Sequence, residues 1–85
     1  MRIVWDEPKR IANLAKHGLD FAALDVAFFE GAIVTPARSS RLVAIGRLTS
    51  SEAVTVIFAP LGGEGLSIVS MRRANKTERD RLDGP

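Results

Sequence analysis

Residues 41–73 read RLVAIGRLTSSEAVTVIFAPLGGEGLSIVSMRR and carry most of the information about the fold. Three runs rich in apolar and β-branched residues, 41–48, 53–59 and 65–73, are separated by TSSE and PLGGEG, which have the composition of hairpin turns. This pattern predicts consecutive antiparallel strands. The middle run is apolar on both faces, so we expect it inside the sheet. Gly46, midway along the first run, indicates a bulge or a close approach by another backbone or a ligand.

The first 18 residues begin with a short strand and continue as a helix. Residues 3–5 have strand composition, and Pro8, which follows two acids, suits the first turn of a helix. Gly18 suits the end of that helix, so we expect it over residues 8–17. Its apolar face holds Ile11, Leu14 and Ala15, and its polar face holds Lys9, Asn13, Lys16 and His17. Simple solvation is the plainest interpretation of the polar face.

A second helix is expected after Asp20, whose side chain can cap it. Phe21, Leu24 and Phe28 recur there at helical spacing, and a Glu-Gly pair at 30–31 ends the pattern. Residues 31–35 then favour a short strand. Near the end of the chain, Asn75-Lys76-Thr77-Glu78 has the form of a capping box, so we expect a short charged helix that offers only Leu82 to the core.

These elements predict an α+β fold with the order β-α-α-β-β-β-β-α. Two helices should pack on one face of a largely antiparallel sheet, and a short helix should follow the last strand. The chain has 85 residues, of which 46% are hydrophobic and 26% charged. That length and composition are typical of one soluble globular domain over residues 1–85.

The basic residues are unevenly distributed along the chain. The formal net charge is +2, but residues 1–30 hold four basic and five acidic side chains, whereas residues 31–85 hold eight and five. A polyanion is therefore expected to dock on the second part of the chain. The sequence has no cysteine, residues 1–8 lack the uninterrupted apolar stretch expected of a signal peptide, and no apolar run is long enough to cross a membrane. These features favour a cytoplasmic protein with no disulfide.

Two adjacent arginines end the last β-rich run. Alternation along a strand places Ser70 and Arg72 on one face and Met71 and Arg73 on the other, together with Val69. If the Met71 face meets the helices, Arg72 faces the open side of the sheet, where Arg47 of the first β-rich run could lie near it. Two guanidinium groups at one place would suit a phosphate. The alternative is that these arginines pair with carboxylates of neighbouring elements.

His17 is the one side chain that normally titrates near neutral pH, so it could move the proton of a ribose hydroxyl. Its alternative role is to satisfy carbonyl groups at a helix end. Trp5 could stack on a base or belong to the core. A single histidine with scattered acids fits no metal-ligand spacing, so we expect neither a metal site nor a cofactor.

Taken in order, several of these residues resemble the BrnT family of bacterial toxins. The matching stretches are Trp5-Asp6, Lys9, Asn13, the KHG of residues 16–18, Phe21, RLVAIGR at 41–47, IVSMRRA at 68–74 and Glu78. The resemblance implies a RelE-like ribonuclease fold and toxicity through cleavage of RNA and arrest of translation. It also implies neutralisation by BrnA, a ribbon-helix-helix antitoxin, through which the complex binds operator DNA. Met71 and the absence of tyrosine depart from the family pattern, so a weakened or inactive member is an alternative.

Within that resemblance we expect metal-independent cleavage driven by the ribose 2′-hydroxyl. The residues expected to act in catalysis are Arg72, Arg47, His17 and Lys16, and those expected to bind RNA are Arg73, Lys9, Arg41 and Trp5. The arginines would stabilise the charge of the transition state, and His17 or Lys16 would transfer protons. Two alternatives stay open: a non-catalytic module that binds nucleic acid or protein, and a homodimer in which the arginines only pair with acids.

Overall fold

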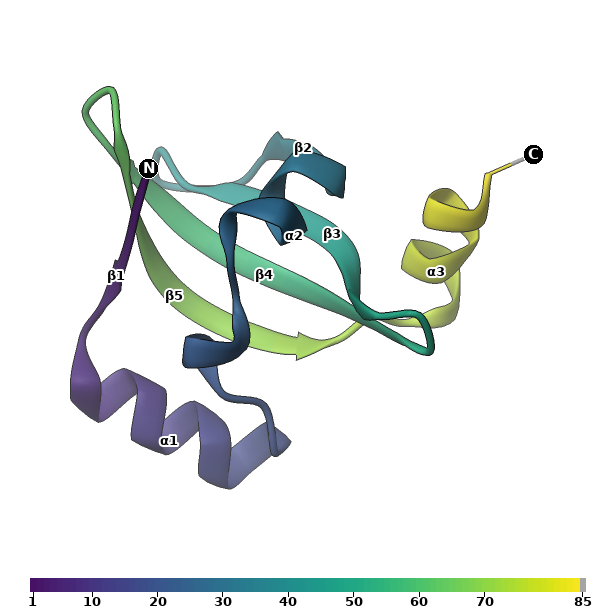
Figure 1. Ribbon diagram of the computed structural model, residues 1–85, viewed down its shortest axis with the longest axis horizontal. Helices are drawn as coiled ribbons and strands as arrows, with labels where there is room; N and C mark the ends of the chain where they lie inside the picture. Colours follow the sequence, from purple (N-terminus) through teal and green to yellow (C-terminus); the bar gives the residue numbers. More distant parts are fainter. Residues whose placement is uncertain (85) are drawn as a thin grey trace.

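A five-stranded sheet forms the centre of the protein, and the computed structural model describes residues 1–84 (Figure 1). In chain order the elements are β1 (Arg2–Trp5), α1 (Glu7–His17), the 3₁₀ helix η1 (Phe21–Ala23), α2 (Val26–Gly31), β2 (Ile33–Pro36), β3 (Leu42–Thr49), β4 (Glu52–Leu61), β5 (Gly65–Arg73) and α3 (Lys76–Asp83). The strand order is β1-β5-β4-β3-β2. Among the strand pairs formed by residues 1–84, only β1–β5 is parallel. The predicted α+β fold and largely antiparallel sheet are confirmed.

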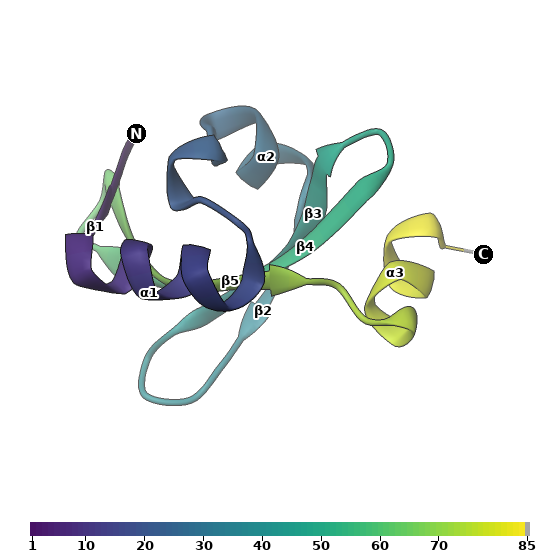
Figure 2. The same ribbon diagram turned by 90° about the horizontal axis from the view of Figure 1, so that it is seen from below.

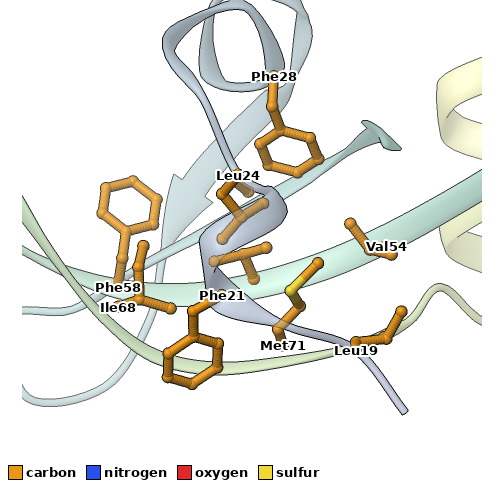
Figure 3. Packing of buried hydrophobic residues seen from close by; sticks show 10 residues of the cluster. Leu19, Phe21, Leu24, Phe28, Val54, Phe58, Ile68 and Met71 are labelled. Atoms are coloured by element: carbon orange, nitrogen blue, oxygen red, sulfur yellow. The ribbon is translucent and has the colours of Figure 1, made fainter. Parts of the chain in front are cut away.

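Because successive side chains of a strand point to opposite faces, the sheet carries a hydrophobic layer on each face. The larger layer packs η1 and α2 against β3, β4 and β5 (Figure 3). Its buried members are Leu19, Phe21, Leu24, Phe28, Ala44, Val54, Val56, Phe58, Ile68 and Met71. The smaller layer lies under α3 and consists of Ile45, Ala53 and Ala74, with Val43 and Leu82 packed against them. Leu82 is thus the apolar contact of α3, as its sequence predicts.

Strand β4 lies in the middle of the sheet, between β5 and β3. Five of its residues are buried, namely Ala53, Val54, Thr55, Val56 and Phe58. The prediction that the run 53–59 lies inside the sheet is therefore confirmed.

The single helix expected after Asp20 is wrong, because the segment forms two short pieces. The Asp20 side chain accepts a hydrogen bond from the Ala22 N–H at 2.9 Å and caps η1. The backbone is then extended at Leu24 and Asp25, and the Asp25 side chain caps α2 through the Phe28 N–H at 2.8 Å. A second capping aspartate thus restarts the helix. The break still leaves Phe21, Leu24 and Phe28 buried in one core.

Helix α1 lies alongside β5, at the end of the sheet away from α3 (Figure 2). Its bounds agree with the prediction, but its apolar face is turned outward: Ile11 is 56% exposed and Leu14 39% exposed. The buried position of the helix is Asn13. Solvation is therefore the wrong interpretation of Asn13, and α1 is attached to the body through polar contacts.

Gly46 is needed because the ring of Phe28 lies against it. A Cβ atom at Gly46 would stand 2.9 Å from Phe28 Cε1 and 3.2 Å from Ala32 Cβ, which is closer than such atoms normally approach. The close approach is thus made by a side chain of α2, and not by the backbone or ligand that the sequence suggested. It lets α2 settle directly on β3.

A bulge in β5 changes which residues face the core. Ser70 is opposite Ile57, whereas Ile68 is opposite Phe58, so Val69 is an extra residue on β5. As a result Ile68 and Met71 both face the helices, although they are three residues apart. The regular alternation that groups Val69 with Met71 is interrupted at this bulge, while Arg72 and Arg73 still point to opposite faces.

Candidate active site

The end of β5 places Arg73 beside the C-terminal end of α1. Arg73 lies on the α1 side of the sheet, and its Nη1 donates a hydrogen bond to the main-chain carbonyl of His17 at 2.7 Å. Its Nε lies 3.6 Å from Glu52 Oε1, a looser and partly solvated pairing. The guanidinium therefore satisfies an otherwise open carbonyl at the end of α1 and remains largely exposed.

A hollow of about 290 Å³ separates α1 from the exposed edge of β5. Strand β1 pairs with β5 only as far as Trp5 and Ile68, so beyond that point α1 takes the place of a neighbouring strand. The hollow is lined by Lys9, Ala12, Asn13, Lys16, His17, Val69 and Ser70. All four polar residues that the sequence places on one face of α1 thus line this hollow beside β5.

Asn13 joins the two elements through its side-chain amide. Its Nδ2 donates to the carbonyls of Met71 at 2.8 Å and Leu19 at 3.2 Å, and its Oδ1 accepts from the Met71 N–H at 3.1 Å. The amide thereby replaces a neighbouring strand at Met71. Sequence reasoning missed this role. No signal within α1 could have identified it, because its partner Met71 lies 58 residues away in the chain.

The hollow and Arg73 together form a basic surface, which we name the edge cluster: Lys9, Lys16, His17, Ser70 and Arg73. Within residues 1–84, no carboxylate forms an ion pair with Lys9 or Lys16. These side chains are exposed, and His17 is half-buried between them and β5. Such an arrangement offers free cationic groups and a titratable group to an anionic ligand.

Arg72 lies on the other face of the sheet and is bound by α3. Its Nη1 and Nη2 donate to Glu78 Oε1 and Oε2 at 2.8 and 2.9 Å, a bidentate ion pair. The side chain of Glu78 is 15% exposed and that of Arg72 is 43% exposed. The hydrogen bonds from Arg72 lower the pKa of Glu78 to about 2, and the Asn75 N–H adds to this effect. The predicted capping box at 75–78 is confirmed and sets the position of Glu78.

Arg47 is also engaged by α3, through an ion pair with Asp83. In the sheet Arg47 stands opposite Ala53, and Arg72 stands opposite Thr55 on the far side of β4. Both arginines thus belong to the α3 face, and each has a carboxylate of α3 as its partner. Of the two possibilities that the sequence left open for Arg47 and Arg72, the structure contains the pairing with neighbouring acids.

Trp5 and Arg41 lie outside the edge cluster. The Trp5 ring packs edge-on against Phe21 with centroids 6.4 Å apart, and its Nε1–H donates to Glu7 at 3.1 Å. Trp5 thus packs at the margin of the core. Arg41 is exposed and immediately precedes β3, at the opposite end of that strand from Arg47.

Within residues 1–84, no group of three or more His, Cys, Asp or Glu side chains is arranged to hold a metal ion. None of the helices formed by these residues has the length and apolar character needed to span a bilayer.

Comparisons with known proteins agree with the fold. A family profile described as the ribonuclease toxin BrnT of type II toxin-antitoxin systems matches residues 5–78. The 1.1 Å crystal structure of the Brucella abortus ribonuclease toxin BrnT is similar, with 53% sequence identity and a TM-score of 0.85 over 89% of this chain and 99% of that chain. Comparison with individually curated proteins gave no significant match. Type II membership implies an antitoxin partner and an RNA target. This chain belongs to the BrnT family of ribonuclease toxins.

Proposed function

We propose that this chain cleaves RNA at the edge cluster with its own side chains and without a metal ion. The family is one of ribonuclease toxins, which supports the reaction class. The observation that carries the location is the hollow in which Lys9, Lys16 and His17 of α1 face Ser70 of β5, beside Arg73. The basic side chains of Arg47 and Arg72, in contrast, are occupied by carboxylates of the same chain.

The proposed step is an attack of the ribose 2′-oxygen on the adjacent phosphorus. His17 accepts the 2′-hydroxyl proton, the bond from phosphorus to the 5′-oxygen breaks, and Lys16 donates a proton to that leaving oxygen. The products are a 2′,3′-cyclic phosphate and a 5′-hydroxyl. Arg73 and Lys9 hold the phosphates on either side and offset the negative charge that grows on the phosphorane.

Arg72 and Arg47 can take part in the reaction only after their own ion pairs are broken. Their guanidinium groups reach an RNA phosphate only if Glu78 and Asp83 are displaced, because a carboxylate already occupies each of them. We therefore assign the transition-state charge first to Arg73 and Lys9. Arg72 and Arg47 have a secondary part in stabilising that charge. We assign Arg41 and Trp5 to more distant contacts with the RNA chain.

The partners follow from the family as proposals. We propose that a ribbon-helix-helix antitoxin of the BrnA type covers the basic surface in the cytoplasm, and that the toxin reaches operator DNA only through it. Release of the toxin would arrest translation by degrading RNA. Co-purification of this chain with the product of an adjoining short reading frame, and loss of RNA cleavage in the complex, would support this assignment.

A non-catalytic binding module is the second candidate. The observation that favours it is the small number of proton-transfer groups, since His17 is the only histidine and the chain has no tyrosine. The homodimer in which arginines pair between copies has less support, because Arg47 and Arg72 each have a carboxylate partner within the same chain.

Matched variants separate these functions. We expect His17→Gln to slow RNA cleavage by on the order of 100-fold or more, with RNA affinity largely kept. Lys76→Ala, which removes an exposed lysine of α3 paired with Asp80, is the charge-matched control for Lys16→Ala and should leave cleavage unchanged. Salt-dependent RNA retention with no turnover in any variant would support the binding module instead.

A further inference from the structure

The buried amide of Asn13 is one of the contacts between the two halves of the edge cluster. Asn13 is 8% exposed, and all three of its hydrogen bonds are made to main-chain groups. Two of these bonds reach Met71, which is 58 residues away in the chain and next to the paired arginines. The third reaches Leu19, just beyond the end of α1.

These bonds restrain His17 from two sides. Asn13 lies four residues before His17, one helical turn away on the same side of α1. Leu19 follows two residues after it, so a single side chain holds the helix and the segment that leaves it. The same amide holds Met71, which fixes the path of β5 into Arg73. Arg73 then donates to the His17 carbonyl at 2.7 Å.

Only an amide can make this set of bonds. The site presents one donor, the Met71 N–H, and two acceptors, the Met71 and Leu19 carbonyls. A leucine of similar size satisfies none of them. An ionised aspartate accepts from the N–H but places its negative charge against two carbonyl oxygens, whereas a protonated aspartate both accepts and donates.

We propose that Asn13 is a positioning residue, whose amide holds His17 and Arg73 at the spacing that RNA cleavage requires. This inference rests on the proposed ribonuclease function. Asn13 lines the hollow but is 8% exposed, and its side-chain amide is occupied by main-chain groups of Met71 and Leu19. It therefore acts through the main chain of α1 and β5 and not by binding phosphate. Its loss should lower the rate of the chemical step more than the affinity for RNA.

The test compares Asn13→Leu, Asn13→Asp and the wild type on one RNA oligonucleotide, at a temperature at which each is folded. We expect Asn13→Leu to lower kcat by on the order of 100-fold, the size of effect that a misplacement of about 1 Å produces, with KM nearly unchanged. Leu24→Ala is the control, because Leu24 is buried in the core under α2 and does not line the hollow. It should lower the melting temperature but keep kcat.

The aspartate variant supplies a readout that a merely structural role would not give. Burial and the two facing carbonyl groups raise the pKa of this carboxylate, whereas Lys9, Lys16 and His17, which line the same hollow, oppose the rise. As the pH falls the carboxylate becomes protonated and recovers the ability to donate. We expect the kcat of Asn13→Asp relative to wild type to rise as the pH falls, while the relative kcat of Leu24→Ala stays flat. A flat ratio for both variants, or a kcat for Asn13→Leu equal to that of Leu24→Ala, would overturn the proposal.

Nuclear magnetic resonance tests whether Asn13 positions His17 and Arg73 without any measurement of RNA cleavage. In Asn13→Leu we expect the Met71 amide to lose protection against hydrogen exchange and the His17 and Arg73 resonances to move, with neither change in Leu24→Ala. If the wild type cleaves no RNA, the proposed function fails, but moved resonances would still support the positioning of His17 and Arg73. Unmoved resonances would overturn it.

Discussion

Glu78 of α3 holds the guanidinium of Arg72 in a two-pronged ion pair, with N–O distances of 2.8 and 2.9 Å. The capping box places this carboxylate, because Glu78 also accepts from the Asn75 N–H at 2.9 Å. One acidic side chain thus starts α3, attaches it to the sheet and neutralises an arginine. The stability of α3 and the availability of Arg72 are therefore linked.

Acid should weaken this attachment. The pKa of Glu78 is lowered from 4.5 to about 2, chiefly by its hydrogen bonds to Arg72. A carboxyl group whose folded pKa is depressed contributes stability above its unfolded pKa and loses that contribution as the pH falls. We expect the free energy of unfolding in urea to drop between pH 4.5 and about 2. In Glu78→Gln this part of the pH dependence should disappear, and an unchanged acid limb would contradict the assignment.

Loss of the helix cap should also destabilise α3. Asn75→Ala removes the side chain that accepts from the Glu78 N–H at 2.9 Å, and such caps are worth about 1 kcal/mol. We expect that loss in the free energy of unfolding, together with faster hydrogen exchange in α3. Lys76→Ala breaks only an exposed pair with Asp80 and should cost less than about 0.5 kcal/mol. Equal effects of the two changes would argue against the cap.

Gly46→Ala should strain the contact between α2 and β3. The new methyl group would meet the Phe28 ring at 2.9 Å, and overpacking of this kind costs about 1–3 kcal/mol. A Gly46→Ala, Phe28→Leu pair should recover part of that loss, because the smaller side chain leaves room. Gly31→Ala, which meets no atom within 4 Å, is the control and should change stability little. Thermal unfolding of these three variants beside the wild type checks the whole set.

Salt should distinguish the two basic faces in RNA binding. Each phosphate contact releases condensed counterions, so Lys16→Ala should reduce the slope of log affinity against log salt by about 0.7 for single-stranded RNA. Arg72→Ala should change that slope less, since Glu78 already neutralises Arg72. The reverse order would place the RNA on the α3 face and would require α3 to move.

Much of the fold could be predicted because local patterns agree with the tertiary structure. The three runs between 41 and 73 form consecutive antiparallel strands, and the Asn75–Glu78 capping box begins α3, as expected. The break at Asp25 could not be seen in the same way. A helical spacing of Phe21, Leu24 and Phe28 is compatible with one helix or with two short pieces that bury the same side chains.

The candidate site was less predictable because it depends on contacts between distant residues. His17, Lys16 and Arg73 stand out by residue type, but the face that each occupies depends on the bulge at Val69 and on where β1 ends. Asn13 is the clearest case. Nothing within α1 distinguishes a solvated asparagine from one that satisfies the main chain of Met71, since its partner is 58 residues away.

The most direct test of the central claim incubates the purified chain with a mixed RNA in EDTA, beside His17→Gln and Lys76→Ala, and maps the ends of the fragments. The account predicts 2′,3′-cyclic phosphate ends with wild type and Lys76→Ala, and their near disappearance with His17→Gln. Intact RNA in every sample, or equal cleavage by His17→Gln, would contradict a ribonuclease centre at the α1–β5 edge.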